Sequence, residues 1–284
     1  MKSCSRLLIL PACLLVGLVA CGRDPAPSPD ATPANPAGPA AGTDMGEDAT
    51  AQAPSGPVEL EDVSEISSAH VIGISYPDSA SRYPGLARLL QQYSDDARAD
   101  LAQAEAARGE GSDDTLYDLS ISYVELVDTP RLYAVAADGS SYTGGAHSAP
   151  LLARWVWLPA EQSLLEITDL VPEGPAWRDI AQRVREQLHT ALSQRLDADE
   201  LDAGERAVMA REAGRMIDDG TGPEPDHYRQ FEPVVDAAGR ITAIRFVFPP
   251  YQVGPYSDGV QTVELPAEVL LPHITDEYRE LFAR

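Results

Sequence analysis

Residues 117–158 decide the fold, and they read YDLSISYVELVDTPRLYAVAADGSSYTGGAHSAPLLARWVWL. In Tyr117–Tyr123, apolar residues alternate with Asp and Ser, which is typical of a strand with one buried face and one wet face. Leu132–Ala137 and Leu151–Leu158 are two further apolar runs of strand length. The glycine-rich segment Asp138–His147 is expected to be a long connection between them. Consecutive strands of this kind favour hairpins over regular βαβ units.

Helices are expected before and after these strands in the sequence. Apolar residues at steps of three and four predict one helix over about 85–108 and another after Gly174-Pro175. A third is expected to begin at Asp197, where Glu200 completes a capping-box-like pattern. Its expected apolar face consists of Leu201, Val208, Met209 and Met216. The remaining expected elements are strands at 70–76, 231–235, 241–248 and 260–265 and a closing helix over 266–282.

This order of elements predicts an α+β fold with mixed, mainly antiparallel strands, packed helices and two adjoining subdomains. The N-terminal subdomain is expected over 58–160 and contains the Gly-Gly-Ala-His loop. The C-terminal subdomain is expected over 161–284 and contains the Pro-Tyr loop. No role is assigned to the extra helix at 197–217.

Composition narrows the classes of partner. The chain has 284 residues, with 21 Lys and Arg against 45 Asp and Glu, and a formal net charge of −24. Contacts to phosphates need clustered basic side chains, so no nucleic-acid partner is expected. An acidic surface suits a cationic partner. At 44% hydrophobic residues the chain can bury a core.

The first 20 residues are expected to be a lipoprotein signal peptide. Lys2 and Arg6 give a positive start, and the apolar run Leu7–Val19 is shorter than the roughly 20 residues of a membrane span. Leu18-Val19-Ala20-Cys21 fits the cleavage box before an acylated cysteine, so we expect Cys21 to carry the lipid, including palmitate. The alternatives are an ordinary secretory signal and an uncleaved anchor. Gly22, where Asp would retain the protein at the inner membrane, favours the outer membrane facing the periplasm.

The segment 21–57 is expected to be the lipidated cysteine and a disordered tether. Residues 22–57 contain eight prolines and nine alanines and no aromatic residue. Such a segment buries too little apolar surface to offset its chain entropy, and its prolines keep it extended. Cys4 and Cys13 leave with the signal, so the mature chain has no disulfide.

No motif of catalysis or metal binding stands out. The sequence has no His-x-x-x-His pair, no Gly-x-Ser-x-Gly elbow and no phosphate-binding loop. His189 is expected to be a packing residue beside the apolar face of its helix, and His227 is expected to lie in a solvated acidic loop. We therefore expect no catalytic residue, no metal and no cofactor. The abundant carboxylates leave one alternative open, which is an acidic pair of the glycosidase type.

Two loops are the candidate binding segments. In Tyr142-Thr143-Gly144-Gly145-Ala146-His147, the adjacent glycines permit positive φ and present the flanking aromatic residues at a loop tip. In Phe248–Tyr256, prolines stiffen the chain and two tyrosines project from it. The candidate binding residues are Tyr142, Gly144, Gly145, His147, Tyr251, Pro255 and Tyr256. The alternatives are a tight bend that needs glycine and tyrosines that cap the core.

In this order, the two segments resemble a pair of adjoining extracytoplasmic domains of unknown function, over about residues 60–284. That pair occurs in the extracellular part of the lysozyme-sensing anti-sigma factor of Gram-positive bacteria, in the accessory region of some peptidoglycan deacetylases, and in stand-alone bacterial lipoproteins. The resemblance implies a binding role at the cell wall, including recognition of lysozyme. Neither named activity transfers, because this sequence shows neither the membrane and cytoplasmic segments of the first nor the metal-site motif of the second.

The function expected is a non-enzymatic cell-envelope lipoprotein that binds a cell-wall-associated partner. That partner is either a cationic protein such as lysozyme or peptidoglycan, and the N-terminal lipid supplies the membrane contact. The alternative is a cell-wall glycan hydrolase, or another carbohydrate-active enzyme, that uses paired carboxylates. An accessory lipoprotein whose partner is another envelope protein is a third hypothesis.

Overall fold

The computed structural model describes residues 58–108, 115–199 and 201–283. The predicted signal peptide 1–20, the lipidation site Cys21 and the tether 22–57 lie outside these residues. Within the part of the chain that is described, no helix is long and apolar enough to cross a bilayer.

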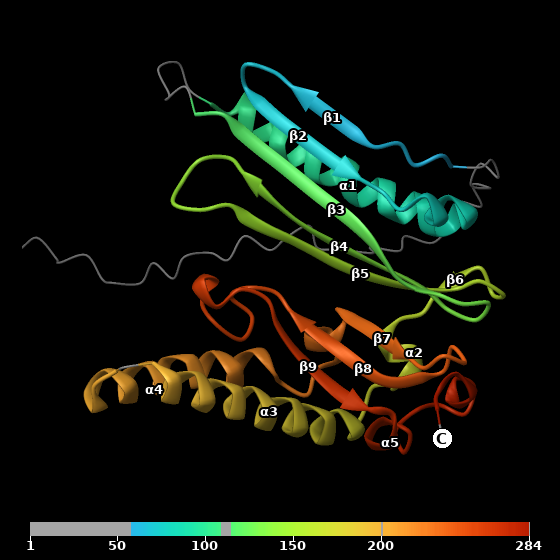
Figure 1. Ribbon diagram of the computed structural model, residues 1–284, viewed down its shortest axis with the longest axis vertical. Coiled ribbons are helices and arrows are strands. Elements are labelled where there is room, and N and C mark those ends of the chain that lie inside the picture. Colours follow the sequence, from blue (N-terminus) through green and yellow to red (C-terminus); the bar gives the residue numbers. More distant parts are fainter. Residues whose placement is uncertain (1–57, 109–114, 200, 284) are drawn as a thin grey trace, which may run out of the picture. The chain divides into compact units, whose positions relative to one another are not determined.

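A six-stranded sheet in the order β1-β2-β3-β4-β5-β6 forms the first part of the fold (Figure 1). Its strands are β1 (Val63–Ile66), β2 (His70–Ser75), β3 (Tyr117–Asp128), β4 (Tyr133–Tyr142), β5 (Ala149–Leu158) and β6 (Ser163–Leu164). β2 and β3 pair in parallel, and the other neighbouring strands pair antiparallel. The helix α1 (Pro84–Ala106) connects β2 to β3, because a parallel pair needs a crossover.

The alternation predicted for β3 is confirmed. Tyr117, Leu119, Ile121 and Tyr123 are buried, whereas on the opposite face Ser120 and Ser122 are exposed and Asp118 is half-buried. The buried side chains pack with Leu86, Leu90, Ala97 and Leu101 of α1. α1 therefore covers one face of the six-stranded sheet (Figure 1).

An antiparallel three-stranded sheet forms the second part. Its strands are β7 (Phe231–Val235), β8 (Ile241–Phe248) and β9 (Gln261–Pro266). The helices of this part are α2 (Ile167–Leu170), α3 (Ala176–Ala198), α4 (Ala203–Gly220) and α5 (Ala267–Leu270). The short 3₁₀ turns are η1 (Asp78–Arg82), η2 (Pro225–Tyr228), η3 (Tyr256–Asp258) and η4 (Arg279–Leu281). The predicted hairpin between β7 and β8 is present, with Gly239 at φ 73° in its turn.

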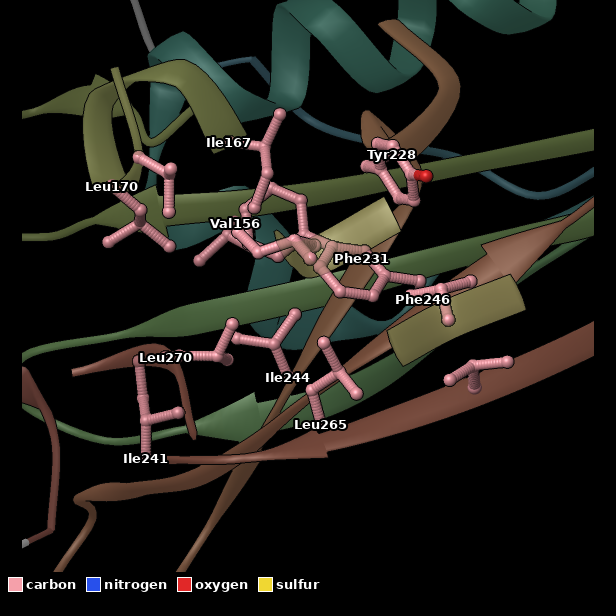
Figure 2. Close-up of a cluster of buried hydrophobic side chains, with 14 of the residues drawn as sticks. Val156, Ile167, Leu170, Tyr228, Phe231, Ile241, Ile244, Phe246, Leu265 and Leu270 are labelled. Atoms are coloured by element: carbon pink, nitrogen blue, oxygen red, sulfur yellow. The ribbon is translucent and has the colours of Figure 1, made fainter. Parts of the chain in front are cut away.

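The larger of two hydrophobic clusters draws on both sheets. Trp177, Ile180 and Val184 of α3 pack in it with β8 and β9. Figure 2 shows Val156 of β5 and Phe231 of β7 among the side chains of this cluster. The burial of α3 follows the three- and four-residue spacing on which its prediction rested.

A chain of ion pairs also joins the two sheets. Arg154 of β5 donates from Nε to Glu232 of β7 at 2.7 Å, and these side chains are only 6% and 12% exposed. Arg154 also pairs with Asp138 of β4 at 2.9 Å. Glu232 accepts a second bond from Arg245 of β8 at 3.1 Å, and Arg245 pairs with Glu264 of β9 at 3.0 Å. The sequence patterns gave no sign of this network.

These elements make an α+β fold of mixed, mainly antiparallel sheets, as predicted. The division into subdomains at residue 160 stays a prediction. β6 lies just beyond that boundary and still pairs with β5.

Three predicted elements were wrong in extent. The first is the connection 138–147, because β4 continues through Tyr142 and pairs with β3. Ser140 of this stretch lies opposite Ser120, so its small polar residues occupy ladder positions and do not form a loop. The true loop is 143–148.

The second concerns the helix expected from Asp197. α3 continues through Asp197 because Leu196 extends its buried face, and the capping box belongs to Asp202 and Glu205 at the start of α4. Val208 and Met209, expected on the apolar face of this helix, are 46% and 44% exposed.

The third is the closing helix over 266–282. Only α5 is α-helical there, because Pro272 has no N–H to continue the helical ladder. The chain instead turns back to β8, where the Ala283 N–H donates to the Ile241 carbonyl oxygen at 2.8 Å.

Candidate functional site

The 143–148 loop joins β4 to β5 and is built on two glycines. Gly144 and Gly145 have φ of 97° and 101°, in a region that favours glycine. Crowding is not what requires glycine here, because a Cβ at either position would meet nothing within 4 Å. The backbone conformation is the requirement. The Tyr142 hydroxyl braces the loop by donating to the Gly145 carbonyl oxygen at 3.1 Å.

The 249–260 loop joins β8 to β9 and begins with a tight turn. The Gln252 N–H donates to the Pro249 carbonyl oxygen at 3.1 Å, which closes a four-residue turn. Pro250 occupies the second position, which proline favours, and Tyr251 the third. Tyr251 has φ 74°, the value that a type II turn requires at this position and that usually selects glycine.

Three anchors fix this loop to the core of the second part. The Gln252 side-chain amide donates to the carbonyl oxygens of Gly220 and His227, at 3.1 and 2.9 Å. Val253 is buried in the larger hydrophobic cluster. Asp258 forms an ion pair with Arg195 of α3 at 2.7 Å. The loop is therefore held at several points along its length.

The two loops meet through an aromatic cluster, which we define as His147, Tyr251 and Tyr256. The His147 ring stacks on Tyr256 with centroids 4.0 Å apart and planes at 15°. Tyr251 lies tilted against both, 6.0 Å from His147 and 5.9 Å from Tyr256. The Tyr251 hydroxyl lies 2.7 Å from His147 Nε2. Residues 104 positions apart in the chain thus form one surface.

The partners of His147 assign its neutral tautomer. Nδ1 lies 3.0 Å from the Ser148 carbonyl oxygen, which can only accept, so we place the ring proton on Nδ1. Nε2 then accepts a hydrogen bond from the Tyr251 hydroxyl. Both ring nitrogens are therefore engaged, and the imidazole is fixed in orientation.

The carboxylates on these segments are engaged in ion pairs. Asp258 pairs with Arg195, and Asp138 pairs with Arg154. Segments 138–150 and 249–261 contain no Lys or Arg. The surface offered by the cluster is thus aromatic, and the two acids within these segments already have cationic partners.

The structure therefore brings the two predicted segments together. Of the predicted binding residues, His147, Tyr251 and Tyr256 are in direct contact. Tyr142, Gly144 and Gly145 shape the first loop, and Pro255 stands before the η3 turn that carries Tyr256. Cys21 lies outside the described residues.

Sequence reasoning missed the residues that hold the site. Ser148 orients His147 through a backbone carbonyl, which no side-chain pattern can signal. Gly220 at the end of α4 allows the 249–260 loop to approach, because a Cβ there would lie 1.9 Å from the Gln252 carbonyl oxygen. Gln252 belongs to no motif that would have singled it out.

The other two histidines that the sequence singled out each lie beside one carboxylate. His189 of α3 pairs with Asp218 of α4 at 3.0 Å and is 40% exposed. His227, in η2, lies 3.8 Å from Glu224. Among the described residues, no three His, Cys, Asp or Glu side chains gather as metal ligands would.

A second aromatic group lies between α1 and β3 and has a structural role. Tyr76 and Tyr123 stack at 4.7 Å, and Ser94 lies between their hydroxyls at 2.6 and 2.8 Å. The Tyr123 hydroxyl also donates to the Leu90 carbonyl oxygen, so each hydroxyl has an acceptor. Burial raises the pKa of Tyr123 far above its usual range and also raises the pKa of Tyr76. These phenols stay neutral and serve the core.

No protein-family model and no curated protein matches the sequence. Two solved structures with similar chain traces are described as DUF3298 family proteins, from Bacteroides fragilis and Pseudomonas aeruginosa. The first is 16% identical, with a TM-score of 0.49, and the match covers 77% of this chain and 93% of that one. The second is 14% identical, with a TM-score of 0.48, and the match covers 79% and 96%.

Both descriptions name a domain-of-unknown-function family. At this level of similarity neither structure assigns a ligand or an activity to this chain. The lipoprotein, anti-sigma factor and deacetylase contexts of the sequence resemblance stay predictions.

Proposed function

We propose that this protein is a non-enzymatic binding module of the bacterial cell envelope, and that its partner is a basic wall-associated protein such as a lysozyme. The aromatic cluster of His147, Tyr251 and Tyr256 is the contact surface. The observation that carries the proposal is Tyr251, which occupies a turn position that glycine would fill without strain. Backbone strain of this kind costs about 1–3 kcal/mol and gathers at functional sites.

The rigidity of the cluster suits a binding surface. Tyr251 is 43% exposed, yet its backbone is fixed by the turn and its hydroxyl by His147. A tyrosine whose rotamer is already ordered gives up little conformational entropy when a partner covers it. Tyrosine is also among the residues that contribute most at interfaces.

Charge favours a basic protein as the partner. Residues 58–284 retain 40 of the 45 acidic side chains and 18 of the 21 basic ones, a net charge of −22. Such a charge attracts a cationic protein and raises its association rate at low salt. Peptidoglycan, the other partner predicted from the sequence, gains less from this field because its glycan strands are uncharged along much of their length.

Contact without bond breaking is the role that the local chemistry favours. A retaining or inverting glycosidase needs two carboxyl groups about 5–10 Å apart and open to substrate. Asp138 and Asp258, the carboxylates on these two segments, each form an ion pair with an arginine. We therefore assign them to the scaffold.

The cellular location of the protein is part of the proposal. A signal of this length followed by Cys21 supports lipid anchoring, and the tether 22–57 would hold the folded part away from the membrane. Metabolic labelling with an alkyne palmitate analogue tests this directly. Label is expected on the wild-type chain and not on Cys21→Ser. Equal labelling of the two chains would overturn the anchoring site.

Calorimetric titration of the purified protein with a basic lysozyme tests the partner. We expect binding at ~20 mM salt that weakens at ~300 mM, as screening shortens the reach of the attraction. Absence of binding at the lower salt would overturn the lysozyme assignment. Salt-insensitive binding to purified peptidoglycan would replace it with the glycan, and release of soluble fragments from that peptidoglycan would overturn the non-enzymatic role.

A further inference from the structure

We infer that the aromatic cluster receives a guanidinium group of the partner, held against the ring of Tyr251. This inference rests on the proposed function and specifies the chemistry of the contact. Its basis is the arrangement of the cluster, the use of tyrosine rings elsewhere in the molecule, and the charge of the chain.

Tyr251 can offer a partner its ring more readily than its hydroxyl. Its hydroxyl proton is held by His147 Nε2 at 2.7 Å, so the hydroxyl is not free to donate to a second acceptor. Tyr251 is 43% exposed, and its ring is what it still offers to a partner. The face of an aromatic ring carries partial negative charge and attracts cations.

The hydrogen bond strengthens this property of the ring. A phenol that donates its proton to an imidazole becomes more electron-rich at the oxygen and in the ring, because hydrogen bonds in series polarise one another. His147 is itself polarised by the Ser148 carbonyl, to which its Nδ1 donates. The relay Tyr251–His147–Ser148 thus points its dipoles so that negative charge accumulates at Tyr251.

Three other tyrosine rings of this molecule lie under arginine side chains. Arg108 lies over the ring of Tyr117 at 3.8 Å, and Arg82 lies over Tyr83 and Tyr133 at 5.4 and 5.7 Å. These rings receive cations from the chain itself. The two segments that form the cluster contain no Lys or Arg.

The arginine that contacts the 249–260 loop is already engaged in an ion pair. Arg195 pairs with Asp258 at 2.7 Å. The cluster is therefore electron-rich and exposed, and residues 58–284 carry a net charge of −22, so a cation from outside is its complementary ligand. A guanidinium fits better than an ammonium, because it is planar, stacks on rings and is more weakly hydrated.

A fluorination series at Tyr251 tests the inference. Phenylalanine with zero, one, two and three ring fluorines is incorporated at position 251, which withdraws charge from the ring face at nearly constant shape. Affinity for lysozyme is expected to fall stepwise across the series, by about 2- to 30-fold in total. The same series at Tyr278, which lies outside both loops, is the matched control and is expected to leave affinity unchanged. A flat series at position 251 would overturn the inference.

A second measurement uses the unmodified chain and alters the partner. Lysozyme with its arginines blocked by cyclohexanedione is compared with lysozyme acetylated on lysine to the same loss of charge. The inference expects the arginine-blocked form to bind several-fold more weakly, and equal binding of the two forms would contradict it. If unmodified lysozyme does not bind at all, the proposed function fails first. If it binds and Tyr251→Gly weakens it, while both tests above are flat, the surface stands and the guanidinium does not.

Discussion

Tyr251 pairs an unfavourable backbone conformation with an exposed ring. A φ of 74° places it in the left-handed region, where a Cβ clashes with the backbone and glycine does not. The rings of His147 and Tyr256 touch its side chain, and part of its surface remains open to solvent. The backbone at position 251 therefore favours glycine, whereas a contact with a partner needs the tyrosine ring.

Replacing Tyr251 separates the two demands. Tyr251→Gly is expected to keep or raise the free energy of unfolding, by up to about 1 kcal/mol, because relief of strain offsets the lost ring contacts. Tyr251→Ala keeps the strain without the ring and is expected to be about 1 kcal/mol less stable than Tyr251→Gly. Urea unfolding of the three proteins measures this. Equal stability of the two variants would show that the turn carries no strain.

Two glycines of the six-stranded sheet give a second prediction at this scale. A Cβ at Gly139 would lie 2.0 Å from the Ser120 carbonyl oxygen, whereas one at Gly73 would meet nothing within 4 Å. Gly139→Ala is expected to lower the free energy of unfolding by about 2 kcal/mol or more, since β3 or β4 must move. Gly73→Ala is the matched control and is expected to be neutral or stabilising. A neutral Gly139→Ala would contradict the close approach of the two strands.

At the scale of the element, the ion pairs between the sheets carry a prediction. Glu232 is nearly buried and bonds both Arg154 and Arg245, so Glu232→Gln removes the carboxylate that the two arginines share. The buried Arg154 then keeps only the half-exposed Asp138 as an acidic partner. We expect a loss of about 3 kcal/mol in the free energy of unfolding.

Asp276→Asn is the control for that substitution. It removes the same charge from the pair with Arg279, in which Asp276 is 93% exposed, and it is expected to cost under about 1 kcal/mol. Similar costs for the two variants, measured by urea unfolding, would show that the inter-sheet network behaves like a surface pair.

Elements were predictable where local pattern and tertiary burial agree. The alternation of Tyr117–Tyr123 survives in β3 because one face of that strand packs under α1. Around residue 200 the pattern is ambiguous, since Asp197 and Asp202 are each followed by Glu at the third position. Burial of Leu196 decides between them, and burial is a tertiary property.

The candidate site was also predictable only in part from the sequence. The composition of each loop marked it as a candidate, and glycine at 144 and 145 does adopt positive φ. The contact between His147 and Tyr251 spans 104 positions and depends on how the β4–β5 hairpin lies beside the second sheet. No periodicity or motif in a single sequence encodes that distance, so the meeting of the loops could only come from the structure.

At the scale of the whole molecule, buried phenols predict alkaline instability. Burial raises the pKa of Tyr93 and of Tyr133 to about 12 and moves the pKa of Tyr123 and Tyr228 in the same direction. These groups stay neutral in the folded chain while they ionise near pH 10 in the unfolded one. The stabilisation is fully present below pH 10 and is lost as the pH rises toward the folded values.

The free energy of unfolding should therefore fall above pH 10, by about 1.4 kcal/mol per pH unit for each phenol that titrates only after unfolding. Urea unfolding at pH 8, 10 and 11 measures the slope, with tyrosinate absorbance followed in the same samples. Tyr123→Phe is expected to reduce it. A stability that stays flat to pH 11, or tyrosinate absorbance that appears before unfolding, would contradict the burial of these rings.

The proposed contact is one surface, which two distant loops build from His147, Tyr251 and Tyr256. Titrating isotope-labelled protein with a basic lysozyme and following the backbone amide resonances locates the contact directly. The largest shifts are expected in residues 143–148 and 249–260, and they are expected to be lost in Tyr251→Gly. Shifts of equal size that centre on α4 or on the face of α1, with these two loops unmoved, would contradict the proposed contact.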